Sequence, residues 1–363
     1  MRYTGAELHG TGVAEGPLVR TDDFDYDLPT GLIAQEPAAP RDSCRMLVVD
    51  RASGQLDHRV FTDIVEYVHP GDLLVVNETR VLPARLKGVK QGTGAVVEVL
   101  LLRERGTDSW ECLVKPGRRL QAGTRVLFGD GEMSGLVVGV VEESGARLVQ
   151  FTVRGGERLT DVVHRIGEVP LPPYITRPLA DPEDYQTVFG TDERSAAAPT
   201  AGLHFTQALL DRVVEEGVHL ARVELDVGLD TFRPVGEDDP NDHHIHTEHF
   251  RVPSWTADAV NACRGRGGRV FAVGTTTVRA LESAFDEPTG RVVAAEGNTG
   301  LFILPGFKFG AVDALITNFH VPRSTLLMMV GAFAGRDLVM RAYETAVEER
   351  YRLLSFGDAM LIL

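Results

Sequence analysis

The chain has few cysteines, no long apolar segment and no excess of basic residues, and each shortage excludes a class of protein. Its three cysteines, Cys44, Cys112 and Cys263, form no CxxC pair, which excludes a disulfide framework and a cysteine-built zinc site. No run approaches the roughly 18 apolar residues of a transmembrane helix, and the first residues lack the charged-then-apolar order of a secretory signal. These absences favour a protein of the reducing cytoplasm with no membrane partner.

The charge balance is acidic. The 363 residues include 37 Lys and Arg against 52 Asp and Glu, which gives a formal net charge of −15. A surface that is basic all over, as in many nucleic-acid-binding proteins, is therefore excluded. The length fits about two domains, and 43% hydrophobic with 25% charged residues is the composition of an ordinary globular protein.

The order of apolar patterns predicts a layered α/β domain with an inserted β domain. Residues 1–20 are expected to form a loose arm, and the run DLLVVN at 72–77 is typical of a strand buried on both faces. Five short β-rich runs fill residues 87–154 without a helical pattern, which favours a small barrel or sandwich. Alternating helices and strands then return. We therefore expect an α/β catalytic domain from residues 1–86 and 155–363, and an inserted domain from residues 87–154.

The predicted insert is relatively basic, with ten Lys and Arg against eight Asp and Glu. Within it, Lys115, Arg118 and Arg119 form a compact turn, KPGRR. By itself such a turn is a solvated hairpin tip, whereas beside a nucleic acid it is a phosphate clamp.

Two segments of the predicted α/β domain have the position of ligand-binding turns. Gly274, Thr275 and Thr276 lie between a strand and a helix, where hydroxyls and free N–H groups favour an anionic or ribose oxygen. The turn lacks GxGxxG and GxxxxGK[ST], so it is neither a dinucleotide fingerprint nor a P-loop. A well-capped helix is the alternative interpretation.

Arg80 follows the early buried strand at its carboxyl end, where open α/β sheets bind ligands. A surface salt bridge is the alternative interpretation of Arg80.

The densest polar run, DHHIHTEH at 242–249, holds four histidines and two carboxylates. The spacing is not HExxH, and in an extended strand at most two or three of these side chains converge. Histidine beside a carboxylate is the usual proton-transfer pair, so acid–base or substrate-contact work is favoured over a metal site or a solvated loop. His204 and His320 each precede a predicted helix cap, where they either face a crevice or serve as structural hydrogen-bonding groups.

Several longer runs, in this order, resemble the S-adenosylmethionine:tRNA ribosyltransferase-isomerase family of queuosine biosynthesis. The similarity extends from about residue 24 to the last residue, and its most specific runs are AAPTAGLHFT and TNFHVPRSTLL. It also includes FDYDLPTGLIAQEP, GDLLVVNETRVLPARL, VKPGRRL, DHHIHTE and AVGTTTVRALES.

This resemblance implies an α/β domain interrupted by a β-barrel domain. It further implies an enzyme that joins the ribosyl part of S-adenosylmethionine to 7-aminomethyl-7-deazaguanine at the wobble position of tRNA. Epoxyqueuosine forms, and adenine and methionine leave. S-adenosylmethionine is then a consumed substrate, no cofactor or metal is implied, tRNA is the partner, and we expect a monomer.

The implied chemistry also suggests roles for particular residues. The sulfonium acidifies the ribose 5′ carbon, so a base and a proton donor are required. We expect proton transfer from His204, His243, His246 and Glu248, substrate contacts from Arg80, Gly274, Thr275, Thr276, His320 and Asp358, and tRNA contacts from Lys115, Arg118 and Arg119.

One departure from the family pattern bears on acceptor recognition. Asp226 and Asp230 stand where the family usually has histidine and glycine. Three alternatives stay open at this point: the same chemistry on a different, possibly non-tRNA acceptor, a metal-dependent hydrolase built on residues 242–249, and a non-catalytic RNA-binding protein.

Overall fold

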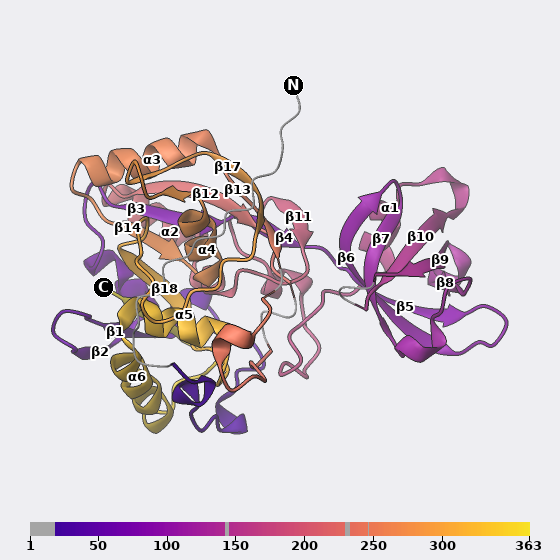
Figure 1. The fold of residues 1–363 in the computed structure, drawn as a ribbon, viewed down its shortest axis with the longest axis horizontal. Helices are drawn as coiled ribbons and strands as arrows, with labels where there is room; N and C mark the ends of the chain where they lie inside the picture. The colour runs from indigo at the N-terminus through magenta and orange to yellow at the C-terminus, as the bar shows by residue number, and fades with distance from the viewer. Residues whose placement is uncertain (1–18, 142–144, 229–232, 246) are drawn as a thin grey trace.

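The computed structural model describes residues 19–141, 145–228, 233–245 and 247–363, and it has two lobes (Figure 1). The larger lobe is a mixed sheet with helices on its faces, and the smaller is a closed six-stranded barrel. The predicted fold class, a layered α/β domain with an inserted β-barrel, is therefore confirmed. Most of the predicted amino-terminal arm lies outside the described residues.

The main sheet has the strand order β17-β13-β12-β3-β14-β18-β19-β1-β2. Its strands are β1 (Arg45–Val49), β2 (Leu56–Val60), β3 (Leu73–Asn77), β12 (His219–Leu225), β13 (Glu248–Val252), β14 (Val270–Val273), β17 (Ala295–Thr299), β18 (Ala314–Asn318) and β19 (Ala359–Ile362). Two short pairs accompany it: β4 (Thr79–Val81) with β11 (Asp192–Ser195), and β15 (Phe285–Asp286) with β16 (Arg291–Val292).

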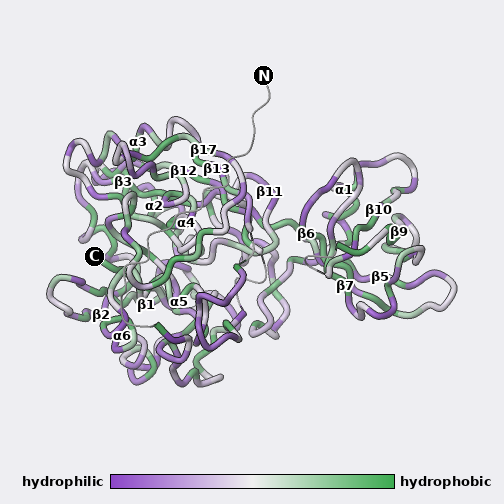
Figure 2. The backbone as a smooth tube through the Cα atoms, viewed as in Figure 1, coloured by the Kyte–Doolittle hydropathy of each residue, from purple (hydrophilic) through white to green (hydrophobic). Residues whose placement is uncertain are grey.

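The central strands are buried on both faces because nearly every residue in them is apolar. In β3, Leu73 and Val75 belong to one hydrophobic cluster, while Leu74 and Val76 belong to the cluster on the opposite face. Alternate side chains of a strand point to opposite faces, so one continuous apolar run supplies both cores. In Figure 2 the larger hydrophobic stretches run through the interior of both lobes.

Six α-helices of the described chain cover the sheet and the barrel. They are α1 (Leu159–Ile166), α2 (Gln207–Glu215), α3 (Ser254–Gly265), α4 (Thr275–Ser283), α5 (Thr325–Ala334) and α6 (Arg336–Glu348). The hydroxyls of Thr206 and Ser324 accept hydrogen bonds from the N–H groups of Leu209 and Leu327, so both predicted caps are present. Among the described residues, no helix is long and apolar enough to cross a membrane.

The barrel closes in the order β10-β7-β6-β5-β8-β9. Its strands are β5 (Arg85–Lys90), β6 (Val96–Gly106), β7 (Ser109–Lys115), β8 (Arg125–Phe128), β9 (Met133–Val140) and β10 (Arg147–Val153). The sequence pattern found five strands and missed β5. Helix α1 shares the barrel core through Leu159, Val162 and Val163. Where the chain enters and leaves this lobe, Arg85 and Glu168 form a two-hydrogen-bond bridge, with N–O distances of 3.0 and 2.9 Å.

Strands β12, β3, β14 and β18 run parallel, so their carboxyl ends meet at one edge of the sheet. Strand β13 is antiparallel to β12 and therefore begins at that same edge. Ligands of open α/β sheets bind outside this edge, which makes it the place to look for a site.

Candidate functional site

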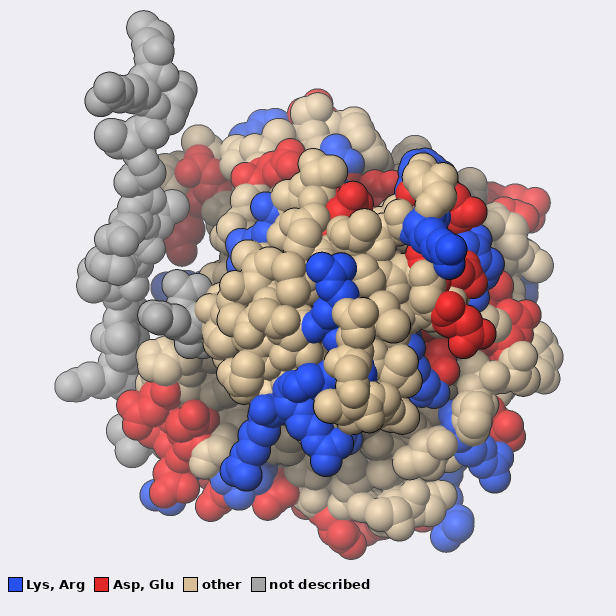
Figure 3. Space-filling model, turned by 90° about the vertical axis from the view of Figure 1, so that its right-hand side faces the viewer, with Lys and Arg blue, Asp and Glu red and all other residues tan. Residues whose placement is uncertain are grey.

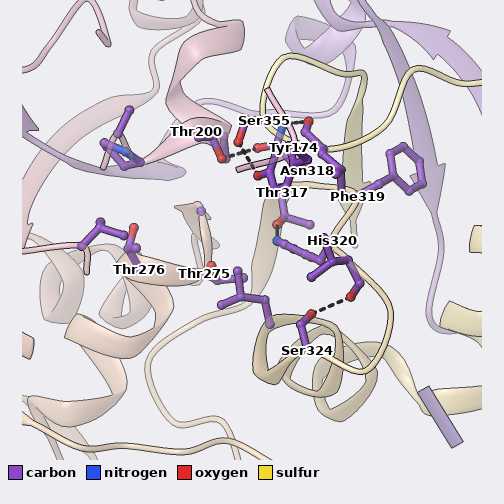
Figure 4. Close-up of a pocket in the computed structure, with 18 residues that line it drawn as sticks. Tyr174, Thr200, Thr275, Thr276, Thr317, Asn318, Phe319, His320, Ser324 and Ser355 are labelled. Atoms are coloured by element: carbon purple, nitrogen blue, oxygen red, sulfur yellow. Dashed lines mark hydrogen bonds between the residues drawn. The ribbon is translucent and has the colours of Figure 1, made fainter. Parts of the chain in front are cut away.

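A pocket of about 550 Å³, part of it open to solvent, lies at the carboxyl edge of the main sheet. Its wall comes from residues 198–201, the start of α4 at 274–276, the segment 317–321 at the end of β18, the start of α5, and residues 354–355. Figure 4 shows Thr275 and Thr276 on one side of the cavity, and Asn318, His320 and Ser324 on the other. Segments far apart in the sequence thus converge here because the parallel strands end together.

The start of α4 presents unused hydrogen-bonding groups to the pocket. Gly274 precedes the helix with φ of 89°, a left-handed conformation that glycine adopts without steric cost. Thr276 is 7% exposed, and its buried Oγ1 has no hydrogen-bond partner within the described chain. Thr277, by contrast, donates from its Oγ1 to the Val273 carbonyl at 2.7 Å. A free hydroxyl beside a helix N-terminus can donate a hydrogen bond to an anionic oxygen.

Asn318 forms the base of the pocket and is held by three neighbours. Its Oδ1 accepts from Thr200 Oγ1 at 3.1 Å, and its Nδ2 donates to the Leu354 carbonyl at 3.2 Å and to His204 Nε2 at 3.1 Å. The other ring nitrogen of His204, Nδ1, faces Cys44 Sγ at 3.2 Å. The structure therefore places His204 behind the pocket wall, with both ring nitrogens engaged.

The environment of His204 keeps its ring neutral. Burial, followed by the positive charges of Arg352 and Arg41, lowers its pKa to about 3. Burial also raises the pKa of the Cys44 thiol well above its usual range. His204 therefore lies between a thiol and the amide of Asn318, and it is not among the described residues that line the pocket.

His320 does line the pocket, and it is neutral as well. Its Nδ1 lies 3.2 Å from the Tyr343 hydroxyl and its Nε2 lies 3.3 Å from Thr317 Oγ1. Burial lowers the pKa of His320 to about 3. The sequence pattern singled out His320 but not Thr317, Asn318 or Tyr174, which also line the pocket. The signal that could have identified Thr317 and Asn318 is their position at the carboxyl end of a buried strand.

The residues predicted from the run 242–249 are separated into different environments. Glu248 is buried against Arg279 of α4, and its Oε1 accepts from Gly228 N at 2.9 Å. His243 Nδ1 lies 2.9 Å from Glu237 Oε2, and its ring packs edge-on to Phe302. His246 lies outside the described residues. In the part of the chain that the structure describes, no three His, Cys, Asp or Glu side chains are grouped to hold a metal ion.

Two predicted substrate contacts do not line the pocket. Arg80 forms salt bridges with Glu183 and with Glu193, the latter at 3.4 Å. A surface salt bridge was the alternative to a ligand contact for this residue. Asp358 is buried, and its two oxygens accept from the backbone N–H groups of Arg45 at 2.9 Å and Arg352 at 2.7 Å. Burial raises the pKa of Asp358 despite these bonds. Asp358 thus binds two backbone N–H groups, whereas Arg80 binds two side-chain carboxylates.

The predicted tRNA contacts lie on the barrel. Lys115 ends β7, and Arg118 and Arg119 form the short 3-10 turn that follows; all three are exposed. Figure 3 faces the outer end of this lobe, where Lys and Arg side chains gather over the centre and Asp and Glu toward the edges. The centre of this barrel face is therefore basic, although the chain as a whole is acidic.

Comparisons with known proteins agree on one family. The profile described as "Queuosine biosynthesis protein" matches residues 21–362. The chain is 55% identical over 345 residues to the S-adenosylmethionine:tRNA ribosyltransferase-isomerase of Symbiobacterium thermophilum, and 52% identical to that of Moorella thermoacetica; each match covers 95% of this chain and 100% of the relative. A crystal structure of S-adenosylmethionine tRNA ribosyltransferase from Thermotoga maritima is 40% identical, with a TM-score of 0.54, and the match covers 94% of this chain and 100% of that one.

Proposed function

Because the chain belongs to the queuosine biosynthesis protein family, we propose that it is an S-adenosylmethionine:tRNA ribosyltransferase-isomerase. It transfers and isomerises the ribosyl part of S-adenosylmethionine onto 7-aminomethyl-7-deazaguanine at the tRNA wobble position, and adenine and methionine are released. The observation that carries this proposal is the 55% identity to a protein of that name over 95% of the chain.

The pocket at the carboxyl edge is the proposed site for S-adenosylmethionine. Its methionine carboxylate binds at the start of α4, where the free N–H groups and the unpartnered Thr276 Oγ1 supply donors. The α4 turn thereby keeps the role predicted for Gly274, Thr275 and Thr276. The remaining polar wall, from Thr317 to His320, contacts the ribose and adenine.

A neutral pocket suits a substrate that carries a positive sulphur. An imidazolium at His320 would repel the sulfonium, and the low pKa of His320, caused by burial, prevents that charge at physiological pH. Phe319 and Tyr174 also line the pocket, and aromatic faces attract cations. The described wall contains no carboxylate, so the aromatic rings and the absence of a positive charge are what favour the sulfonium at this site.

We assign the proton transfers to the polar run 242–249, in which Glu248 and His249 begin β13 at the same edge of the sheet. Glu248 anchors this segment through Arg279, and His243 and His246 remain its candidate acid–base groups. His204 is reassigned from proton transfer to positioning, because its contacts are Cys44 and Asn318. Arg80 and Asp358 are reassigned in the same way, as residues that hold the frame of the site.

The barrel face binds the tRNA backbone through Lys115, Arg118 and Arg119, since phosphate contacts need local positive charge. S-adenosylmethionine is consumed as a substrate, so the reaction needs no cofactor. We expect the enzyme to act in the cytoplasm, where tRNA is found.

The test is a product assay. Purified protein is incubated with S-adenosylmethionine and tRNA that carries the 7-aminomethyl-7-deazaguanine precursor, and adenine, methionine and epoxyqueuosine are measured. Equal amounts of all three support the proposal. Methylated tRNA would overturn it, and adenine release that does not depend on tRNA would point to another acceptor.

A further inference from the structure

Asp226 and His249 face each other at the carboxyl edge with buried polar atoms that no described residue satisfies. The Asp226 N–H donates to the His249 carbonyl at 2.9 Å, which continues the antiparallel pairing of β12 and β13 and puts both side chains on one face. Asp226 Oδ2 lies 3.9 Å from His249 Nδ1. Among the described residues, Asp226 Oδ1 and His249 Nδ1 have no hydrogen-bond partner. Such atoms are costly to bury, so their retention calls for a ligand.

The pair is accessible and anionic overall. The side chains of Asp226 and His249 are 27% and 25% exposed, so a small group can approach the pair, although Asp226 Oδ1 and His249 Nδ1 themselves are buried. His249 Nε2 lies 3.6 Å from Glu296 Oε1, which adds negative charge behind the imidazole. The other charged groups that act on Asp226 are Arg194, Arg103 and Glu224.

Arg194 and Glu224 do not hydrogen-bond to these unsatisfied atoms, because they bind each other. Glu224 lies between Arg194, at 2.8 Å, and Arg251. Burial raises the pKa of Asp226 to about 6, although Arg194, His249 and Arg103 act to lower it. At neutral pH Asp226 is therefore mostly ionised and is also a stronger base than an ordinary aspartate.

The location of the pair connects the pocket to the barrel. Val227, the next residue along the chain, lines the pocket. Arg103 of barrel strand β6 reaches across to the Thr247 carbonyl, at 3.4 Å, just before β13. Asp226 therefore lies beside a pocket residue, and the barrel contacts the segment just before β13.

We propose that Asp226 and His249 form the site for a primary ammonium group, the aminomethyl substituent of the acceptor base, and that Asp226 takes a proton from it. This inference rests on the proposed function. One N–H bond of the ammonium breaks, its electron pair stays on nitrogen, and the proton joins a carboxylate oxygen of Asp226. The neutral amine then attacks the sugar. The new carbon–nitrogen bond takes the place of the glycosidic bond to adenine, whose electron pair leaves with adenine, and the extra proton on the amine nitrogen passes to adenine. His249, 3.9 Å from the carboxylate, forms the other wall of the site.

The first test measures binding without S-adenosylmethionine, so that it does not depend on turnover. Wild type and Asp226→Asn are titrated with two tRNAs, one carrying 7-aminomethyl-7-deazaguanine and one carrying guanine at the wobble position. Loss of the carboxylate should weaken binding of the amine-bearing tRNA by about 10-fold or more and leave the unmodified tRNA unchanged. Asp258→Asn, which removes an exposed carboxylate from α3, is the matched control and should change neither affinity.

The second test follows the rate of transfer against pH. Wild-type turnover should fall as pH drops through about 6, where Asp226 becomes protonated. In Asp226→Asn the rate should be low at neutral pH and rise about tenfold per pH unit toward about 10, because only the amine that is already neutral reacts. His249→Gln should lower the rate and keep the wild-type shape more closely.

Two outcomes would overturn the inference. One is equal affinity of Asp226→Asn and wild type for the amine-bearing tRNA, and the other is a uniform loss of activity with no recovery at high pH. The unmodified tRNA shows whether each variant is folded. Failure of the proposed function would look different, since wild type itself would then release no adenine from S-adenosylmethionine.

Discussion

Replacing Thr276 by valine should weaken substrate binding and strengthen the fold at the same time. The hydroxyl that is lost has no partner in the described free protein, and the added methyl group occupies nearly the same space. In the complex the same hydroxyl would donate to the methionine carboxylate of S-adenosylmethionine. The two effects therefore have opposite signs, which few substitutions in a binding pocket produce.

The magnitudes follow from what Thr276 Oγ1 contacts in each state. A hydrogen bond to a charged group contributes about 1.5–3 kcal/mol, so the KM for S-adenosylmethionine should rise by roughly 10- to 150-fold. An unsatisfied buried hydroxyl costs about 1 kcal/mol or more, so Thr276→Val should raise the free energy of unfolding by about 1 kcal/mol.

Thr277→Val is the matched control, one residue along the same helix. Thr277 is fully buried, and its hydroxyl is satisfied by the Val273 carbonyl, so this variant should lose about 1 kcal/mol of stability and keep its KM. KM is measured by adenine release at saturating tRNA, and stability by urea unfolding. If Thr276→Val kept the wild-type KM, or if both variants changed KM alike, the assignment of the carboxylate to the α4 turn would be wrong.

Three further predictions concern the frame of the site and the barrel. Arg279→Met leaves the buried Glu248 carboxylate without its cation and should lower the free energy of unfolding by about 3 kcal/mol in urea titrations; a loss below 1 kcal/mol would show that the pair is dispensable. The pKa of His204 falls from 6.5 in the unfolded chain to about 3 in the fold, so wild type loses stability as pH drops from 6.5 to about 3. In His204→Gln the free energy of unfolding should fall less steeply over this range, by roughly 1 kcal/mol per pH unit. An unchanged slope would contradict a neutral His204. Charge reversal at Arg118 and Arg119 should weaken tRNA binding and reduce the slope of log affinity against log salt by about 1 to 2, with the KM for S-adenosylmethionine unchanged; an unaltered slope would place the tRNA elsewhere.

The fold was largely predictable because its strongest signals are local. The continuous apolar run at 73–76 could only be a strand covered on both sides, and the caps at Thr206 and Ser324 mark helix starts by residue type. Strand β5 was missed because its six residues, RLKGVK, mix charges and glycine with few apolar positions. It is a strand because its neighbours β6 and β8 supply the hydrogen bonds, and pairing of that kind is not encoded in a single segment.

The candidate site was only partly predictable, because most of its contacts join residues far apart in the sequence. The α4 turn was found because a strand, a glycine and three threonines are consecutive. The contact of His204 with Cys44 spans 160 positions, and that of Glu248 with Arg279 spans 31. No spacing rule anticipates such pairs, so two histidines that look alike in sequence differ in place: His320 lines the pocket, and His204 lies behind Asn318.

The bridge between Arg85 and Glu168 means that the polypeptide departs from the sheet-containing lobe and returns to it at a single point. The residues between Arg85 and Glu168 form one inserted domain. The barrel has a hydrophobic core of its own, so substitutions inside it need not change the strand order around the pocket. Under the proposed function, tRNA binding by the barrel could therefore change while the pocket stays as it is.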